Sequence, residues 1–121
     1  MHDQQDIKQA LQQWAQTYGG TQFERLGYVG QDRLQAASTV QGDAPADRVE
    51  RIVQRLAARG YWKEAQVLRA DCFLASLPES ERLQRLSRIG LRIGRGSYYI
   101  YLKGALLFLE GAFCGPSVLS R

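Results

Sequence analysis

The stretch from residue 77 to residue 109 limits the fold most, because it combines two helical segments with glycines between them. Pro78 can start the first helix, and Glu79 and Glu81 in its first turn carry the sign that complements a helix N-terminus. We predict the second helix over residues 97–113 from its apolar spacing. Two helices joined by a glycine-containing turn are typical of a helix-turn-helix.

Two positions of the turn are compatible with the glycines of this stretch. With Gly94 in the turn, which we favour, Gly90 lies where the two helices cross, and its small size lets them approach. In that register the inward residues are Ile89, Ile93 and Ile100, and the residues that project from the second helix are Ser97, Tyr98 and Tyr101. With Gly90 in the turn, Leu86, Ile89 and Leu91 are inside instead, but the connection Arg92 to Gly96 becomes overlong.

The same stretch carries a local excess of positive charge. Six basic side chains lie between residues 82 and 103, with no Asp or Glu among them. They are Arg82, Arg85, Arg88, Arg92, Arg95 and Lys103. Such a run suits a phosphate backbone, and Ser97, Tyr98 and Tyr101 would face base edges in the major groove. The alternative is a helical hairpin with a solvated arginine-rich face.

Length and charge point to one domain with a basic second half. A chain of 121 residues can bury one modest core, so we expect a single helical domain over 1–121. Residues 1–50 hold seven acidic and four basic side chains, whereas residues 51–121 hold five acidic and twelve basic ones. A partner that is attracted by positive charge would therefore bind the second half.

Few residues suited to metal binding or catalysis are present. His2 is the only histidine, and Cys72 and Cys114 are far apart, so we expect no zinc site, no disulfide framework and no cofactor. Without a usable histidine or an acid pair outside solvated helix faces, we expect no enzyme. The polar N-terminus and the short apolar run 105–114, which Glu110 interrupts, predict a cytoplasmic protein with no membrane partner.

The rest of the chain also shows helical periodicity. In the predicted N-terminal helix, 1–18, Asp3 is the cap and the apolar stripe is Ile7, Leu11, Trp14, Ala15 and Tyr18. An irregular segment, 19–44, follows. A helix pair covers 45–76: the first helix is capped by Asp43 and carries Val49, Ile52, Val53 and Leu56, and the second runs from Trp62 to Ser76. The helix-turn-helix and C-terminal helix occupy 78–113.

Several segments resemble the Q-type phage late-gene antitermination proteins, including their bacterial relatives of the AlpA kind. The matching segments are LQQWAQ (11–16), EAQVLRADCF (64–73), LPE (77–79), IGLRIGRGSYYIYL (89–102) and GALLFLEGAF (104–113). In the C-terminal domain of sigma factors a leucine-proline pair also precedes a helix-turn-helix, and Leu77–Pro78 resembles that pair. The resemblance therefore implies an all-α, compact helical domain with a sigma-like helix-turn-helix.

The resemblance also implies a function and partners. Such a protein binds double-stranded DNA beside a promoter, loads onto paused RNA polymerase with its sigma factor, and promotes read-through of terminators by altering the RNA exit channel. Contact with nascent RNA and binding to DNA as a dimer are further alternatives that the resemblance leaves open. The DNA contacts carried over to this chain are Arg92, Arg95, Ser97, Tyr98 and Tyr101, with Arg88 and Lys103 on phosphates, and Arg85 joins the phosphate set as a flanking basic residue.

Two other functions remain open from the residues alone. A helix-turn-helix regulator that acts at initiation would use the same DNA contacts without travelling with the polymerase. A helical protein-interaction adaptor would explain the apolar segment Ala105 to Leu109 without any DNA. The first would leave read-through unchanged, and the second predicts that polyanions compete poorly for binding.

Overall fold

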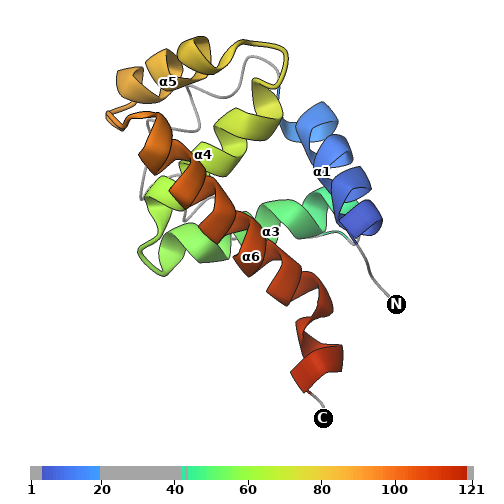
Figure 1. Cartoon of the computed structure of the whole chain (residues 1–121). Coiled ribbons are helices and arrows are strands. Elements are labelled where there is room, and N and C mark those ends of the chain that lie inside the picture. The colour runs from blue at the N-terminus through green and yellow to red at the C-terminus, as the bar shows by residue number, and fades with distance from the viewer. Residues whose placement is uncertain (1–3, 20–41, 43, 120–121) are drawn as a thin grey trace.

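Five α-helices account for most of the residues that the structure, a computed structural model, describes: 4–19, 42 and 44–119. Within these ranges, side chains are described from Ile7 to Phe113. They are α1 (Gln4–Tyr18), α3 (Pro45–Ala58), α4 (Trp62–Phe73), α5 (Glu79–Arg88) and α6 (Arg95–Leu119). No strand is present among these residues, so the predicted all-α class is confirmed. Figure 1 shows α6 crossing the bundle in front of α3 and α4, with α5 beside its start.

The larger core lies between α1, α3, α4 and α6. Apolar side chains at helical spacing on each helix meet here, which is the usual reason that amphipathic helices pack. The predicted stripe of α3, Val49, Ile52, Val53 and Leu56, is buried as expected. Trp14 of α1 is fully buried against the ring of Phe73, so it belongs to the core, as its place in the predicted apolar stripe indicates.

A buried ion pair lies inside this core. Glu50 of α3 accepts hydrogen bonds from both terminal nitrogens of Arg69 of α4, each at 3.0 Å. Trp14 Nε1 and Gln54 Nε2 donate to the same carboxylate at 2.8 and 2.6 Å. Burial alone would raise the pKa of Glu50, but the charge and hydrogen bonds of Arg69 outweigh it and lower the pKa. Apolar spacing does not predict this pair, because both members are charged and lie nineteen residues apart in the chain.

A smaller core joins α4, α5, the chain after α5 and the start of α6. Its buried residues are Val67, Ala70, Leu74, Leu86, Leu91 and Tyr98. Leu91 belongs to this core because α5 ends in a left-handed turn at Gly90, with φ of 99°. There the N–H of Leu91 donates to the carbonyl of Leu86, and the N–H of Gly90 donates to that of Ser87. This pattern is a Schellman motif, and it returns the chain to the core.

Several predicted boundaries need correction. The helix predicted to reach Ser76 ends at Phe73, and α6 extends beyond the predicted range 97–113 in both directions. The N-cap of α3 is Ala44 with Pro45 in the first turn, while Asp3, Asp43 and most of the predicted irregular segment lie outside the described residues. Within the described ranges, no helix is long and apolar enough to cross a membrane.

Candidate nucleic-acid interface

The turn between α5 and α6 has the register that we did not favour. Gly90 closes α5 on the surface, and Gly94 is the last residue before α6, so no helix crossing occurs at Gly90. The connection has six residues, 89–94, which is longer than the three or four of a typical helix-turn-helix. The predicted Gly94 register is therefore wrong, and the sigma-like helix-turn-helix is not confirmed.

Tyr98 is a predicted DNA contact that the structure buries in the smaller core. Its side chain is 0% exposed, and its hydroxyl donates to Asp71 Oδ1 at 2.8 Å and accepts from Arg82 Nε at 3.0 Å. Arg82 also donates to the carbonyl of Leu77 at 2.7 Å. Burial, together with the hydrogen bond to Asp71, raises the pKa of Tyr98. The hydrogen bonds of Tyr98 thus connect α6 to α4 and α5, and its side chain cannot reach a base edge.

Helix α6 is rotated relative to the prediction. Ile100, which was expected to point inward, is 70% exposed, because the buried face of α6 passes through Tyr98, Ala105 and Leu109 instead. Ile89 and Ile93 are partly buried against the smaller core, as expected. The apolar C-terminal half of α6 packs on α3 and α4 and thereby sets the rotation of the whole helix. The N-terminal half takes the same rotation because the helix is continuous.

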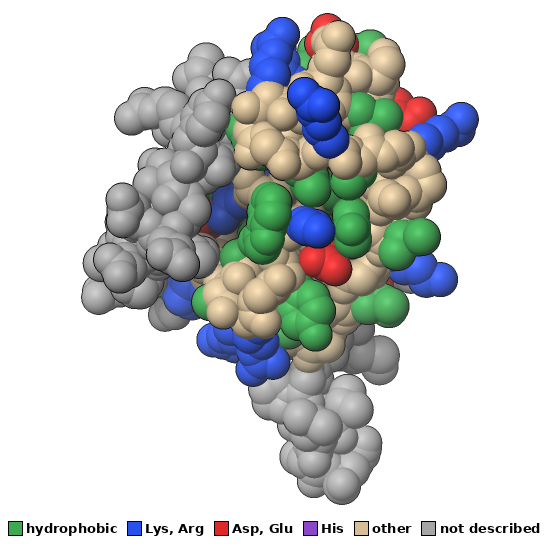
Figure 2. All heavy atoms as spheres, turned by 90° about the vertical axis from the view of Figure 1, so that its left-hand side faces the viewer, with side chains coloured by type: hydrophobic (Ala, Val, Ile, Leu, Met, Phe, Trp, Pro, Cys, Tyr) green, Lys and Arg blue, Asp and Glu red, His purple; other side chains and the backbone are tan. Residues whose placement is uncertain are grey.

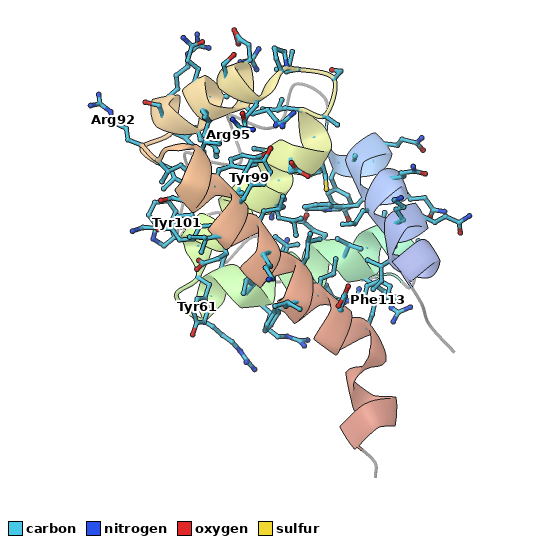
Figure 3. The ribbon with its side chains drawn as sticks, viewed as in Figure 1. Tyr61, Arg92, Arg95, Tyr99, Tyr101 and Phe113 are labelled. Carbon is cyan, nitrogen blue, oxygen red and sulfur yellow. The ribbon has the colours of Figure 1, made fainter. Side chains whose placement is uncertain are left out.

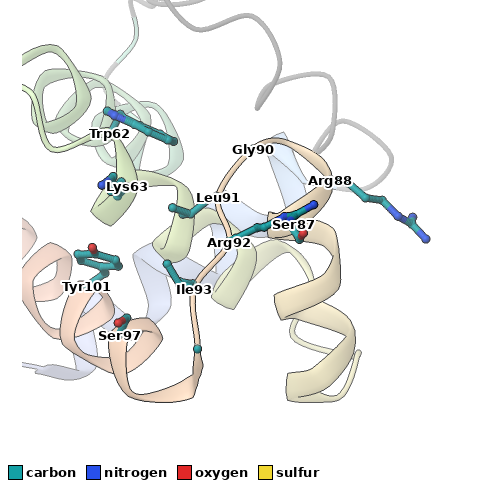
Figure 4. Close-up of a pocket in the computed structure, with 11 residues that line it drawn as sticks. Trp62, Lys63, Ser87, Arg88, Gly90, Leu91, Arg92, Ile93, Ser97 and Tyr101 are labelled. Carbon is teal, nitrogen blue, oxygen red and sulfur yellow. The ribbon is translucent and has the colours of Figure 1, made fainter.

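An open groove of about 840 Å³ lies beside the first turns of α6. Its walls come from the start of α4, the end of α5, the 89–94 connection and α6 (Figure 4). The polar and aromatic residues that line it are Trp62, Lys63, Ser87, Arg88, Arg92, Ser97 and Tyr101. Leu91 and Ile93 lie between the two sides of the groove. The groove therefore offers hydroxyl, cationic and aromatic groups together.

The charge around the groove is positive. Arg92 is exposed, and within the described chain neither Arg92 nor Lys63 has a carboxylate partner. Arg88 lines the rim and points away from the centre (Figure 4). Arg92, Tyr101 and Tyr61 follow one another down one side of the molecule in Figure 3, and Figure 2 shows basic side chains among apolar ones on that side. Mixed basic and aromatic surfaces of this kind suit nucleic acid.

The N-terminus of α6 adds backbone donors at the same place. The first intrahelical hydrogen bond runs from the N–H of Tyr98 to the carbonyl of Gly94, at 3.0 Å. The N–H groups of Arg95, Gly96 and Ser97 come before it and have no intrahelical acceptor. Such groups, together with the helix dipole, favour a phosphate. This end of the groove is thus suited to a phosphate contact.

The other predicted DNA contacts are spread over different surfaces. Ser97, Tyr101, Arg88 and Arg92 line the groove together. Arg95 is exposed but forms an ion pair with Glu79, with Nε 3.3 Å from Oε2. The two remaining residues do not line the groove: Arg85 is on α5, and Lys103 is on the exposed side of α6. The structure therefore assembles half of the eight predicted residues in one place.

Trp62, Lys63 and Ser87 line the groove, although the sequence did not indicate them as site residues. Trp62 is 43% exposed, although its spacing of three residues from buried Ala65 would place it on the core side of α4. As the first residue of its helix, it extends past the edge of the core. No sequence signal distinguished it, because the same spacing describes a core position.

Comparison of the chain with protein-family models, with curated protein sequences and with solved structures finds no match.

Proposed function

We propose that the protein binds double-stranded DNA through this groove and acts as a transcription antitermination factor. The observation that carries the DNA proposal is the arrangement of Arg92, Lys63 and the α6 N-terminus around Ser97 and Tyr101. In this arrangement the cations and backbone donors would hold phosphates, while the two hydroxyls would meet base edges. The contact set differs from the predicted one, because the groove is not lined by Arg85, Arg95, Tyr98 or Lys103 and is lined by Lys63 and Trp62.

Salt dependence tests the electrostatic part of the proposal. About four phosphate contacts predict a loss of affinity of roughly a hundredfold between about 50 and about 200 mM salt. Anisotropy with a labelled duplex from upstream of the protein's own gene measures this. An affinity that is indifferent to salt would refute phosphate binding by the groove.

Paired variants locate the contact surface. Arg92→Ala and Lys63→Ala should weaken binding to specific and random duplexes by similar factors, and each should lower the salt slope by about one. Arg55→Ala is the matched control, because Arg55 is also exposed and basic but lies on α3, outside the groove. Equal losses for all three variants would mean that only net charge matters and would remove the groove from the proposal.

Sequence readout depends on the two hydroxyl groups. Ser97→Ala and Tyr101→Phe should reduce the preference for the cognate duplex while leaving binding to random DNA nearly unchanged. Both residues can lose a hydroxyl without a change in the core, because Ser97 is exposed and Tyr101 is only partly buried. A preference unchanged in both variants would assign base recognition to another surface.

The antitermination part of the proposal is supported by the resemblance of the segments 64–73, 77–79, 89–102 and 104–113. In this proposal the protein loads onto paused RNA polymerase that still holds its sigma factor, and it alters the RNA exit channel so that terminator hairpins fail to form. Transcription in vitro from the cognate promoter, with an intrinsic terminator far downstream, separates this function from regulation of initiation. We expect more read-through at unchanged initiation. Altered initiation at constant read-through would instead identify an initiation regulator.

A further inference from the structure

The exposed face of α6 has the spacing of a coiled-coil seam. Its residues are Ile100, Gly104, Leu107 and Gly111, at intervals of four, three and four, and all four are exposed. Ile100 is 70% and Leu107 is 58% exposed, which makes them the most exposed large apolar side chains of the described chain. Small residues alternate with large ones along this seam, so it resembles one half of a close helix pair.

The fold itself does not require the two glycines of this seam. A Cβ at Gly111 would meet nothing within 4 Å, and one at Gly104 would meet only Glu64 Cγ, at an ordinary 3.8 Å. Glycine weakens a helix interior relative to alanine, so neither position favours the isolated chain. A neighbouring helix that approaches closely would give both glycines a structural role.

We propose that a second copy of this chain occupies the seam, in an antiparallel two-fold pair of α6 helices. An axis midway between Ala105 and Leu106 places Ile100 opposite Gly111 of the partner copy and Leu107 opposite Gly104. Each large side chain then faces a small one, in both directions. A parallel pair would place glycine on glycine and isoleucine on isoleucine, which leaves gaps at some layers and crowds others.

Charge supports the same partner and the same direction. Lys103 and Glu110 flank the seam on one side, seven residues apart, and neither makes an ion pair among the described residues. In the antiparallel pair Lys103 of each copy comes beside Glu110 of the other, so two equivalent ion pairs form across the axis. A surface that complements itself in shape and in charge indicates an isologous contact.

Sedimentation velocity of the full chain over a range of concentrations measures the pairing directly. We expect a species of twice the 13.6 kDa monomer mass as concentration rises. Leu107→Lys should shift the equilibrium to monomer without loss of helical circular dichroism, because the side chain is exposed. Tyr61→Lys is the control, since Tyr61 is 52% exposed but lies outside α6, and it should dimerise normally. Monomer at every soluble concentration, or a dimer indifferent to Leu107→Lys, overturns the proposal.

Charge exchange provides a second test of the geometry. Lys103→Glu and Glu110→Lys should each weaken dimerisation by about tenfold, the double variant should restore it, and a mixture of the two single variants should form heterodimers. Gly111→Ala should stabilise the helix and yet weaken the dimer. Failure of the double variant to recover overturns the antiparallel arrangement. No DNA is present in these measurements, so they can fail or succeed independently of the proposed function.

Discussion

Removal of Arg69 should destabilise the protein far more than a typical single substitution. The guanidinium is buried, with a side chain 7% exposed, and it supplies two of the four hydrogen bonds that reach the Glu50 carboxylate. Arg69→Met keeps much of the apolar stem but leaves a buried carboxylate with neutral donors only. Breaking a buried pair in this way costs about 3–5 kcal/mol, against a total stability of about 5–15 kcal/mol.

The stability lost in Arg69→Met should also depend on pH, and the environment of Glu50 determines the direction of this dependence. In the native protein the pKa of Glu50 is lowered from 4.5, so its stabilising contribution is present above that value and is lost as pH falls. Without Arg69, burial dominates and raises the pKa, so Glu50 becomes protonated in the folded variant at mildly acid pH. The difference between variant and native protein should therefore be largest near neutral pH and should shrink toward acid pH.

Urea unfolding followed by circular dichroism, at neutral pH and near pH 4.5, measures both effects. Arg55→Met on the exposed side of α3 is the control and should change stability by no more than about 0.5 kcal/mol. The double variant Glu50→Leu with Arg69→Met should recover most of the loss, because it leaves no buried charge. A loss below about 1 kcal/mol for Arg69→Met, or one that does not vary with pH, would refute this reasoning.

Three further predictions concern local features. Tyr98→Phe should cost about 1–3 kcal/mol in thermal unfolding, because the ring stays packed while the buried carboxylate and guanidinium lose their shared hydroxyl. Burial raises the pKa of Cys72 from 9.0 to about 12 and that of Tyr18 from 10.0 to about 12. The protein should therefore lose stability as pH rises from 9.0 toward 12. Melting temperatures across that range measure this loss, and a constant melting temperature would contradict it. Gly90→Ala should lower the free energy of unfolding by about 1 kcal/mol or more, because Gly90 has a φ of 99°. Gly96→Ala is the control and should be neutral or stabilising. Equal effects of the two variants in chemical denaturation would contradict the role of the turn.

Helical periodicity was sufficient to predict the larger core. Val49, Ile52, Val53 and Leu56 recur on one face of α3, and all four are buried. Trp14 was assigned to the core for the same reason, and its burial confirms the assignment. These predictions succeeded because each depends on the spacing within a single helix.

The features that depend on contacts between helices could not be predicted in this way. Tyr98 is polar at its tip, and only the positions of Asp71 on α4 and Arg82 on α5 allow that tip to be buried. Glu50 and Arg69 are nineteen residues apart and become a pair only when α3 packs on α4. The register of the turn was misjudged because Gly90 and Gly94 are both compatible with a turn, and the hydrogen bonds that select Gly90 involve the backbone alone.

Two of the three glycines with positive φ among the described residues have a consequence for how the groove could change in evolution. Gly60 and Gly90, with φ of 102° and 99°, each end a helix with the same pair of backbone hydrogen bonds. Gly60 directs the chain toward Trp62 and Lys63, and Gly90 directs it toward Arg92. Since backbone groups hold both turns, the lining side chains can be exchanged without altering the walls that carry them. Such a surface could acquire a new binding preference through substitutions that leave folding nearly unaffected.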